Sequence, residues 1–118
     1  MSQVSWVVEG TIPEGKFEEL KSLSSEMSAA TQANEPGTLR YEWFIDPERT
    51  IVYLYELYTD SAAAMVHLKT FGETFAQRFE QAVRVERVSV YGDASDEVLK
   101  TLGEEGVVMM VEMNGFAR

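Results

Sequence analysis

Residues 35–71 read EPGTLRYEWFIDPERTIVYLYELYTDSAAAMVHLKTF, and this stretch decides the fold. Two runs rich in β-branched and aromatic residues, at 38–46 and 51–59, flank a short turn that contains proline, which predicts a β-hairpin. Asp60 precedes three alanines and should therefore cap the start of a helix that continues through His67. The stretch predicts strand, strand and helix in direct succession.

The rest of the chain places further elements on both sides of this stretch. They are a strand at 3–11, a helix at 16–32, a helical piece that spaces Phe71, Phe75 and Phe79 four apart, a strand at 82–91, a helix at 96–102 and a final apolar strand at 106–113. Gly72 is expected to interrupt the helix after the hairpin. The order predicts an α+β fold, a ferredoxin-like βαββαβ antiparallel sheet with its helices on one face. We expect one domain over 1–118, with its core at about 3–91 and a C-terminal helix-strand extension at 92–118.

The composition limits which classes of protein the chain can join. Its 118 residues are 45% hydrophobic and include 20 acidic against 10 basic side chains, a net charge of −10. This charge repels nucleic-acid phosphates and anionic membrane surfaces, so neither is an expected partner. The first ten residues lack a basic segment and a long apolar run, so we expect a cytoplasmic protein without signal peptide or transmembrane span. Because the chain has no cysteine, it has no disulfide, thiol nucleophile or thiolate metal site.

The predicted hairpin strands are apolar on both of their faces. In the first strand Tyr41 and Trp43 point to one face and Phe44 to the other, and the second strand is apolar or aromatic at nearly every position. Helices on one face leave the other open, and a soluble monomer rarely exposes that much apolar surface. We therefore predict a homodimer whose two sheets pack face to face. The large apolar residues at 107–111 should also be covered, either by joining a sheet edge or by reaching the partner subunit.

Two side chains are candidates for catalysis. His67 is the only histidine, and imidazole titrates near neutrality, although its helix neighbours place it at the margin of the buried stripe, where a structural or half-exposed histidine is the alternative. Glu56 is a carboxylate in an apolar strand, which is costly unless it is paired. One hairpin register puts Arg40 opposite Glu56 and predicts a salt bridge, whereas a shift by one residue puts Tyr41 beside it. In the functional interpretation, Glu56 orients His67 and fixes its tautomer.

The hairpin also supplies candidates for binding a planar ligand. These substrate-binding candidates are Tyr41, Trp43, Tyr53, Tyr55, Tyr58 and Arg40. Tyrosine hydroxyls can hold ligand oxygens, although aromatic residues are also favoured in strands for packing alone. A single histidine with scattered carboxylates lacks the clustering of a transition-metal site, and no glycine-rich phosphate loop is present. We therefore expect neither a metal nor a cofactor.

Three segments are similar to a known family: EPGTLRYE at 35–42, VYLYELY at 52–58 and DSAAAMVHL at 60–68. They resemble the antibiotic biosynthesis monooxygenase-like domains of the dimeric α/β barrel superfamily, and the resemblance extends over about residues 3–91. It implies a homodimer and, in catalytic members, a cofactor-independent oxidation of quinols or polyphenols by O₂. In this interpretation His67 removes a proton from the bound quinol or phenol.

The chain departs from this family pattern at one place. Many relatives carry a second histidine after the helix, where this chain reads KTFGETF at 69–75, so a two-histidine site is impossible. The haem-degrading branch is disfavoured because the first strand has no Asn and residues 60–81 have no Trp. Two functions stay open: a monooxygenase, and a non-catalytic dimeric barrel that binds a small hydrophobic ligand.

Overall fold

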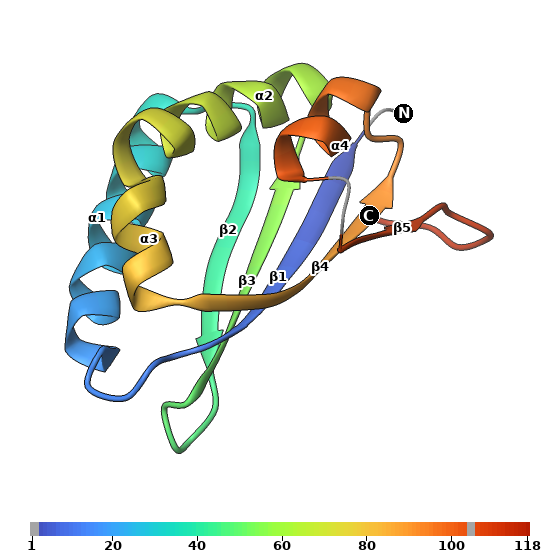
Figure 1. Ribbon diagram of the computed structural model, residues 1–118. Helices are drawn as coiled ribbons and strands as arrows, with labels where there is room; N and C mark the ends of the chain where they lie inside the picture. Colours follow the sequence, from blue (N-terminus) through green and yellow to red (C-terminus); the bar gives the residue numbers. More distant parts are fainter. Residues whose placement is uncertain (1–2, 104–105) are drawn as a thin grey trace.

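The computed structural model describes residues 3–103 and 106–118. Its elements are β1 (Val4–Thr11), α1 (Phe17–Asn34), β2 (Thr38–Ile45), β3 (Ile51–Tyr58), α2 (Ser61–Thr70), the π-helical turn η1 (Phe71–Phe75), α3 (Ala76–Ala82), β4 (Arg84–Gly92), α4 (Asp96–Leu102) and β5 (Val107–Met110). The sheet has the strand order β2-β3-β1-β4-β5, with its helices on one face (Figure 1). All its pairs are antiparallel except β4 with β5. The predicted α+β, ferredoxin-like arrangement is confirmed.

Local hydrogen bonds explain where the hairpin turns and where α2 begins. Asp46 closes the turn, because its Oδ1 accepts the backbone N–H groups of Thr50 and Ile51 at 2.8 and 2.7 Å. Asp60 caps α2 as predicted, with its carboxylate accepting the Ala63 N–H at 2.8 Å. The hairpin and the helix that carries His67 are therefore fixed by short-range contacts.

The α-helix is interrupted around Gly72, as expected, because α2 ends at Thr70 and the π-helical turn η1 that follows contains Gly72. The chain passes from α2 into α3 through the wider turn η1, without leaving the helical path. Phe75 and Phe79 are buried in the core and Phe71 packs against it. The aromatic spacing therefore keeps this segment on the sheet, and this packing outweighs the low helix propensity of one glycine.

Two hydrophobic clusters fill the space between the helices and the sheet. One includes Met27, Val52 and Phe79, and the other includes Trp6 and Tyr58. The candidate site described below lies where these clusters meet. None of the helices in the described part of the chain is long and apolar enough to cross a membrane.

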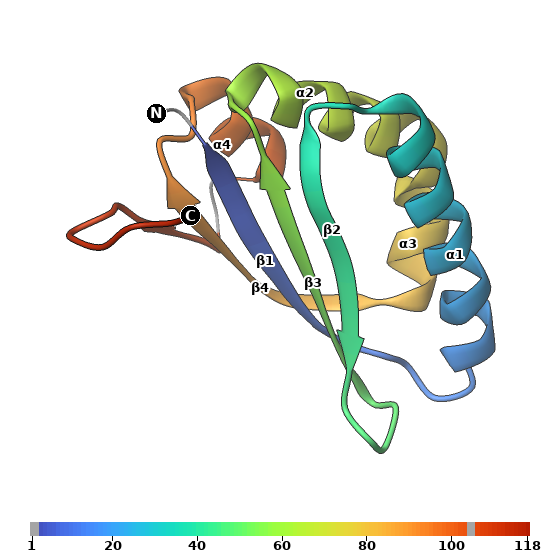
Figure 2. The ribbon, with the colours of Figure 1, turned by 180° about the vertical axis from the view of Figure 1, so that it is seen from behind.

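The other face of the sheet has no helix over it, as Figure 2 shows for β1, β2 and β3. Large side chains are exposed there, including Phe44, which is 54% exposed, Tyr53 and Tyr91. The apolar character of both faces, which motivated the dimer prediction, is therefore present in the folded chain. The dimer itself stays a prediction.

The C-terminal strand joins the edge of the sheet. β5 pairs in parallel with β4, so that Val88 lies beside Val107 and Tyr91 beside Met110. It ends at Met110, shorter than the predicted 106–113. The expected covering of 107–111 is not found within the single chain, since Met109 and Met110 are 50% and 51% exposed.

Candidate functional site

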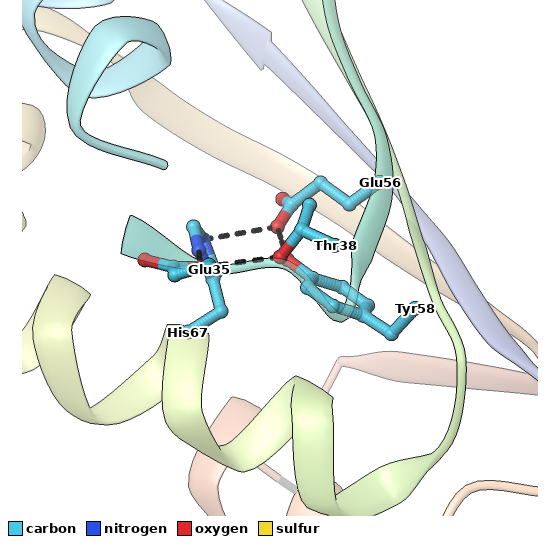
Figure 3. A network of polar contacts seen from close by, with 5 residues as sticks. All are labelled: Glu35, Thr38, Glu56, Tyr58 and His67. Atoms are coloured by element: carbon cyan, nitrogen blue, oxygen red, sulfur yellow. Dashed lines mark hydrogen bonds and ion pairs between the residues drawn. The ribbon is translucent and has the colours of Figure 1, made fainter. Parts of the chain in front are cut away.

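His67 lies on α2 with its ring between two carboxylates (Figure 3). Its Nδ1 is 2.7 Å from Oε1 of Glu35, and its Nε2 is 3.2 Å from Oε1 of Glu56. The side chain is not at the margin of the core, as its helix neighbours suggested, because only 5% of the residue is exposed. The helix positions it under the sheet, where partners from two other segments reach it.

Glu35 comes from the segment that ends α1 and leads into β2. Its backbone N–H donates to the Thr31 carbonyl at 3.0 Å and closes the helix. Pro36 follows, and proline disfavours a helical conformation at the preceding residue. Thr38 then donates its N–H to the Glu35 carbonyl and its hydroxyl to Oε1 of Glu35, at 3.0 and 3.2 Å. The segment between α1 and β2 thus holds the Glu35 carboxylate in place through its own hydrogen bonds.

Glu56 belongs to β3, and the observed hairpin register decides between the two sequence alternatives. Tyr41 lies opposite Glu56, while Arg40 lies opposite Leu57. The Arg40–Glu56 salt bridge is therefore absent, and Arg40 instead pairs with Glu42. Glu56 points inward, is buried, and is brought to His67 as the functional interpretation required.

A tyrosine completes this polar chain. The Tyr58 hydroxyl donates to Oε1 of Glu56, the same oxygen that contacts His67. No hydrogen bond among the described residues reaches Oε2 of Glu56. One oxygen of Glu56 therefore holds the network together, and the other is available to a ligand.

Burial and hydrogen bonding act in opposite directions on His67. Burial lowers its pKa, but the hydrogen bonds to Glu35 and Glu56 and the negative charges of both carboxylates raise it, with a net result of about 9. The ring is therefore an imidazolium at neutral pH, the form that donates from both nitrogens. Burial, together with the charge of Glu56, raises the pKa of Tyr41 and of Tyr58 far above the ordinary tyrosine value, so both hydroxyls stay protonated.

A cavity of about 450 Å³ opens beside this network, and we call it the Glu56 cavity. Its polar wall contains Tyr41, Glu56 and His67, with Glu80 and Thr101 contributing from α3 and α4. The remaining wall is apolar and includes Met27, Leu54, Phe71 and Phe79. No lysine or arginine is among the described residues that line it. This volume and this lining are typical of a site for a small, largely apolar molecule.

Two polar atoms near this cavity are buried and have no hydrogen-bond partner: the hydroxyl of Tyr41 and Nε1 of Trp43. Leaving such groups unpaired costs about 1–3 kcal/mol each. The Tyr41 ring packs against His67, at 5.3 Å between centroids, and Trp43 packs edge-on against Tyr41. Tyr41 is also a lining residue of the cavity, so this unpaired hydroxyl belongs to the wall of the site.

The structure divides the sequence candidates into two groups. His67, Glu56 and Tyr41 line the Glu56 cavity, Tyr58 contacts Glu56, and Trp43 packs against Tyr41. Arg40, Tyr53 and Tyr55 are not brought to His67, because they project from the uncovered face of the hairpin, where Arg40 stacks on Tyr55 at 4.5 Å.

Sequence reasoning missed Glu35 as a site residue. The sequence shows Glu35 only as the first residue of the family-like segment at 35–42, because the partner that gives it a role is 32 positions away. The one signal in the sequence was its place in the glutamate-proline-glycine segment at 35–37. For metals, no group of three or more His, Cys, Asp or Glu side chains is arranged to hold an ion within residues 3–103 and 106–118.

The fold and this network define a class: a ferredoxin-like α+β domain with a buried glutamate-histidine pair beside a ligand-sized cavity. Residues 4–71 match the family model for antibiotic biosynthesis monooxygenase. Since the match covers more than half of the chain and includes Glu35, Glu56 and His67, the chain belongs to the antibiotic biosynthesis monooxygenase family.

Several solved structures share this fold. MupZ from Pseudomonas fluorescens has a TM-score of 0.85 at 22% identity, covering 100% of this chain and 96% of MupZ. SnoaB from Streptomyces nogalater, described as a cofactor-independent oxygenase, has a TM-score of 0.67 at 18% identity, covering 80% and 96% of the two chains. Rv0793 from Mycobacterium tuberculosis has a TM-score of 0.65 at 21% identity, covering 80% and 98%. No curated protein matches the chain.

Proposed function

We propose that this protein is a monooxygenase that oxidises a phenolic or quinol-like small molecule with O₂ in the Glu56 cavity. The observation that carries the proposal is the convergence of Glu56, His67 and Tyr41 on one largely apolar cavity. Membership of the monooxygenase family and a shared fold with SnoaB, a cofactor-independent oxygenase, support the reaction class. We propose that the reaction here is likewise independent of a cofactor.

The residue that accepts the substrate proton is Glu56 in this proposal. His67 was the base expected from the sequence, but an imidazolium with a pKa of about 9 has no free electron pair for a proton at neutral pH. Oε2 of Glu56 is available, and a positioned carboxylate can act as a general base. The positive ring of His67 then stabilises the oxyanion that forms beside it.

The electron balance needs no external reductant. The deprotonated phenol passes one electron to O₂, and the resulting substrate radical and superoxide combine to form a carbon–oxygen bond. Loss of water from this peroxide leaves a carbonyl group. One naphthol and one O₂, for example, give one naphthoquinone and one water, so the substrate supplies all the electrons. The protein contributes deprotonation, orientation and exclusion of water.

The charges around the cavity favour an uncharged substrate. The only cation in its described wall is His67, and both of its ring nitrogens already contact carboxylates. Glu80 adds a further negative charge to the wall, and the whole chain carries −10. A carboxylated or phosphorylated ligand would meet repulsion without a compensating partner.

Oxygen uptake tests the proposal. The dialysed, chelator-treated protein is mixed with naphthols and naphthalenediols, and uptake above the spontaneous rate is measured together with ¹⁸O incorporation into the product. We expect one O₂ consumed and one labelled oxygen retained per product. If the protein binds these compounds but never accelerates uptake, the proposed reaction is wrong.

A second candidate, a binding protein without turnover, is favoured by one specific observation. Both nitrogens of His67 are occupied by carboxylates, an arrangement that a purely structural network also explains. Ligand binding can be followed by thermal shift, because a ligand of the native state raises its stability. A thermal shift without any oxygen uptake supports this second candidate.

We also propose that two copies of the chain pair through the uncovered face of the sheet. Phe44, Tyr53 and Tyr91 are exposed there, and the partly exposed β5 continues the apolar surface at one edge. Light scattering at micromolar concentration should give twice the mass of the chain. A monomer mass would contradict the pairing.

A further inference from the structure

We propose that Glu35 is a positioning residue of this site: from behind the His67 ring, its carboxylate fixes the orientation of the imidazole so that Nε2–H faces Glu56. This inference rests on the proposed function only for its consequence on turnover. Glu35 is not among the residues that line the Glu56 cavity, so it acts through His67 and not on the ligand.

The contact geometry supports this role. The Glu35–His67 contact, at 2.7 Å, is shorter than the 3.2 Å contact between His67 and Glu56. Both partners of the shorter contact are about 95% buried, so water does not replace either one. A ring that donates from Nδ1 to a fixed carboxylate cannot flip without losing that charge-assisted hydrogen bond. Its Nε2 is thereby kept 3.2 Å from Oε1 of Glu56.

The backbone that follows Glu35 packs very closely against the start of α2. The Gly37 carbonyl accepts the Thr59 N–H at 3.0 Å, just before the helix begins. A Cβ at Gly37 would stand 2.6 Å from Cβ of Ala63, one helical turn before His67. Only glycine allows this approach, and it brings the Glu35 segment against the helix that carries the histidine.

Several groups that affect proton binding surround the ring, and they come from each packed element. Glu35 and the Thr38 hydroxyl belong to the α1–β2 segment, Tyr41 to β2, and Glu56 and Tyr58 to β3. On its own helix, Lys69 is exposed, and Glu80 of α3 lines the same cavity. Among these groups, Glu35 and Glu56 are the two carboxylates in direct contact with the ring.

NMR gives a direct test because the chain has one histidine, so its ring resonances belong to His67 without ambiguity. We expect Glu35→Gln to lower the observed midpoint of His67 titration by about one pH unit or more, because it removes an adjacent opposite charge. The matched control is Glu26→Gln, another glutamate of an ion pair, but with Arg78 on the surface. The control should leave the titration of His67 unchanged.

Two further variants separate position from charge. Gly37→Ala keeps the Glu35 carboxylate but pushes its segment away from α2, so it should also lower the midpoint and broaden the ¹⁵N ring resonances. Glu35→Asp retains the charge on a shorter side chain and should restore part of the effect lost in Glu35→Gln. Circular dichroism of each variant confirms that the domain is folded.

The inference is overturned if folded Glu35→Gln titrates like the Glu26→Gln control. Its failure can be distinguished from failure of the proposed function, because the titration needs no substrate. If Glu35→Gln shifts the titration and the wild type turns over no phenol, the positioning role stands without the monooxygenase. If the wild type is active, Glu35→Gln should lower kcat more than it raises KM and should move the pH profile of kcat.

Discussion

The two faces of the hairpin carry similar residues in very different surroundings. On the inner face, Glu56 meets His67 inside the protein, where both are buried. On the outer face, Glu42 meets Arg40, and both of these side chains are about half exposed. Each pair joins a carboxylate to a nitrogen cation, yet the inner pair is buried beside the Glu56 cavity, whereas Arg40 lines an open hollow on the outer face.

The difference shows that burial, not residue type, determines what an ion pair can do. Water and salt screen the outer pair, so its contribution to stability is small. The inner pair is poorly screened, so each charge strongly affects the proton affinity of the other and of a bound ligand. The sequence presents the two glutamates in the same way, since Glu42 and Glu56 both follow a tyrosine in an apolar strand.

The largest expected effect comes from matched changes to the two glutamates. Glu56→Gln should lower kcat for oxygen uptake by about 10²-fold or more, because it removes the proposed base. Glu42→Gln, its outer-face counterpart, should keep wild-type activity. Steady-state oxygen-electrode kinetics measure both variants. Equal activities would contradict the proposal that the inner glutamate, and not the outer one, acts in the reaction.

The second largest expected effect is a pH dependence of stability that comes from the buried His67 and not from the exposed Arg40–Glu42 pair. The pKa of His67 is raised from 6.5 to about 9 by folding, so this group stabilises the folded state most fully below pH 6.5. That stabilisation, about 3 kcal/mol for such a difference, is lost as the pH rises through about 9. Urea unfolding between pH 6 and 10 should show the loss. The variant His67→Gln should lack this pH-dependent component. If its free energy of unfolding falls with pH as steeply as that of the wild type, other groups cause the effect.

A smaller difference is expected between two tyrosines. Tyr41→Phe removes the unpaired hydroxyl of the cavity wall, whereas Tyr53→Phe removes the hydroxyl of an exposed tyrosine on the outer face, which interacts with Glu9. Loss of one hydrogen bond to a neutral ligand should weaken binding about threefold to tenfold. Fluorescence titration with a naphthol measures both variants, since Trp6 lines the cavity. Equal affinities would show that the Tyr41 hydroxyl does not touch the ligand.

The smallest effect is expected at Arg40, the outer-face candidate of the sequence analysis. Arg40→Gln breaks a solvent-exposed contact with Glu42 and a stack on Tyr55. We expect no change in oxygen uptake and none in the titration of His67. A marked loss of activity would mean that the outer face takes part in the site, for example through the partner subunit of the proposed dimer.

Much of the fold could be predicted from local patterns. The helix cap at Asp60 and the short helix Asp96–Leu102 form where the sequence indicates, because a cap and a periodic apolar stripe act over a few residues. An interruption at Gly72 was indicated, but its π-helical form could not be predicted, since it depends on contacts of Phe75 and Phe79 with distant elements. The spacing of these phenylalanines indicates a helix, but not the width of its turn.

By itself, the sequence determined the elements, their order and an apolar character on both faces of the hairpin, because these depend on neighbouring residues and on period. Only the tertiary structure decided the site. It chose the register that faces Tyr41 and Glu56 inward, and it brought Glu35 to His67 across 32 positions. The physical reason is that a shift by one residue reverses the faces of a strand at little local cost, so that packing of the whole domain selects the pairing.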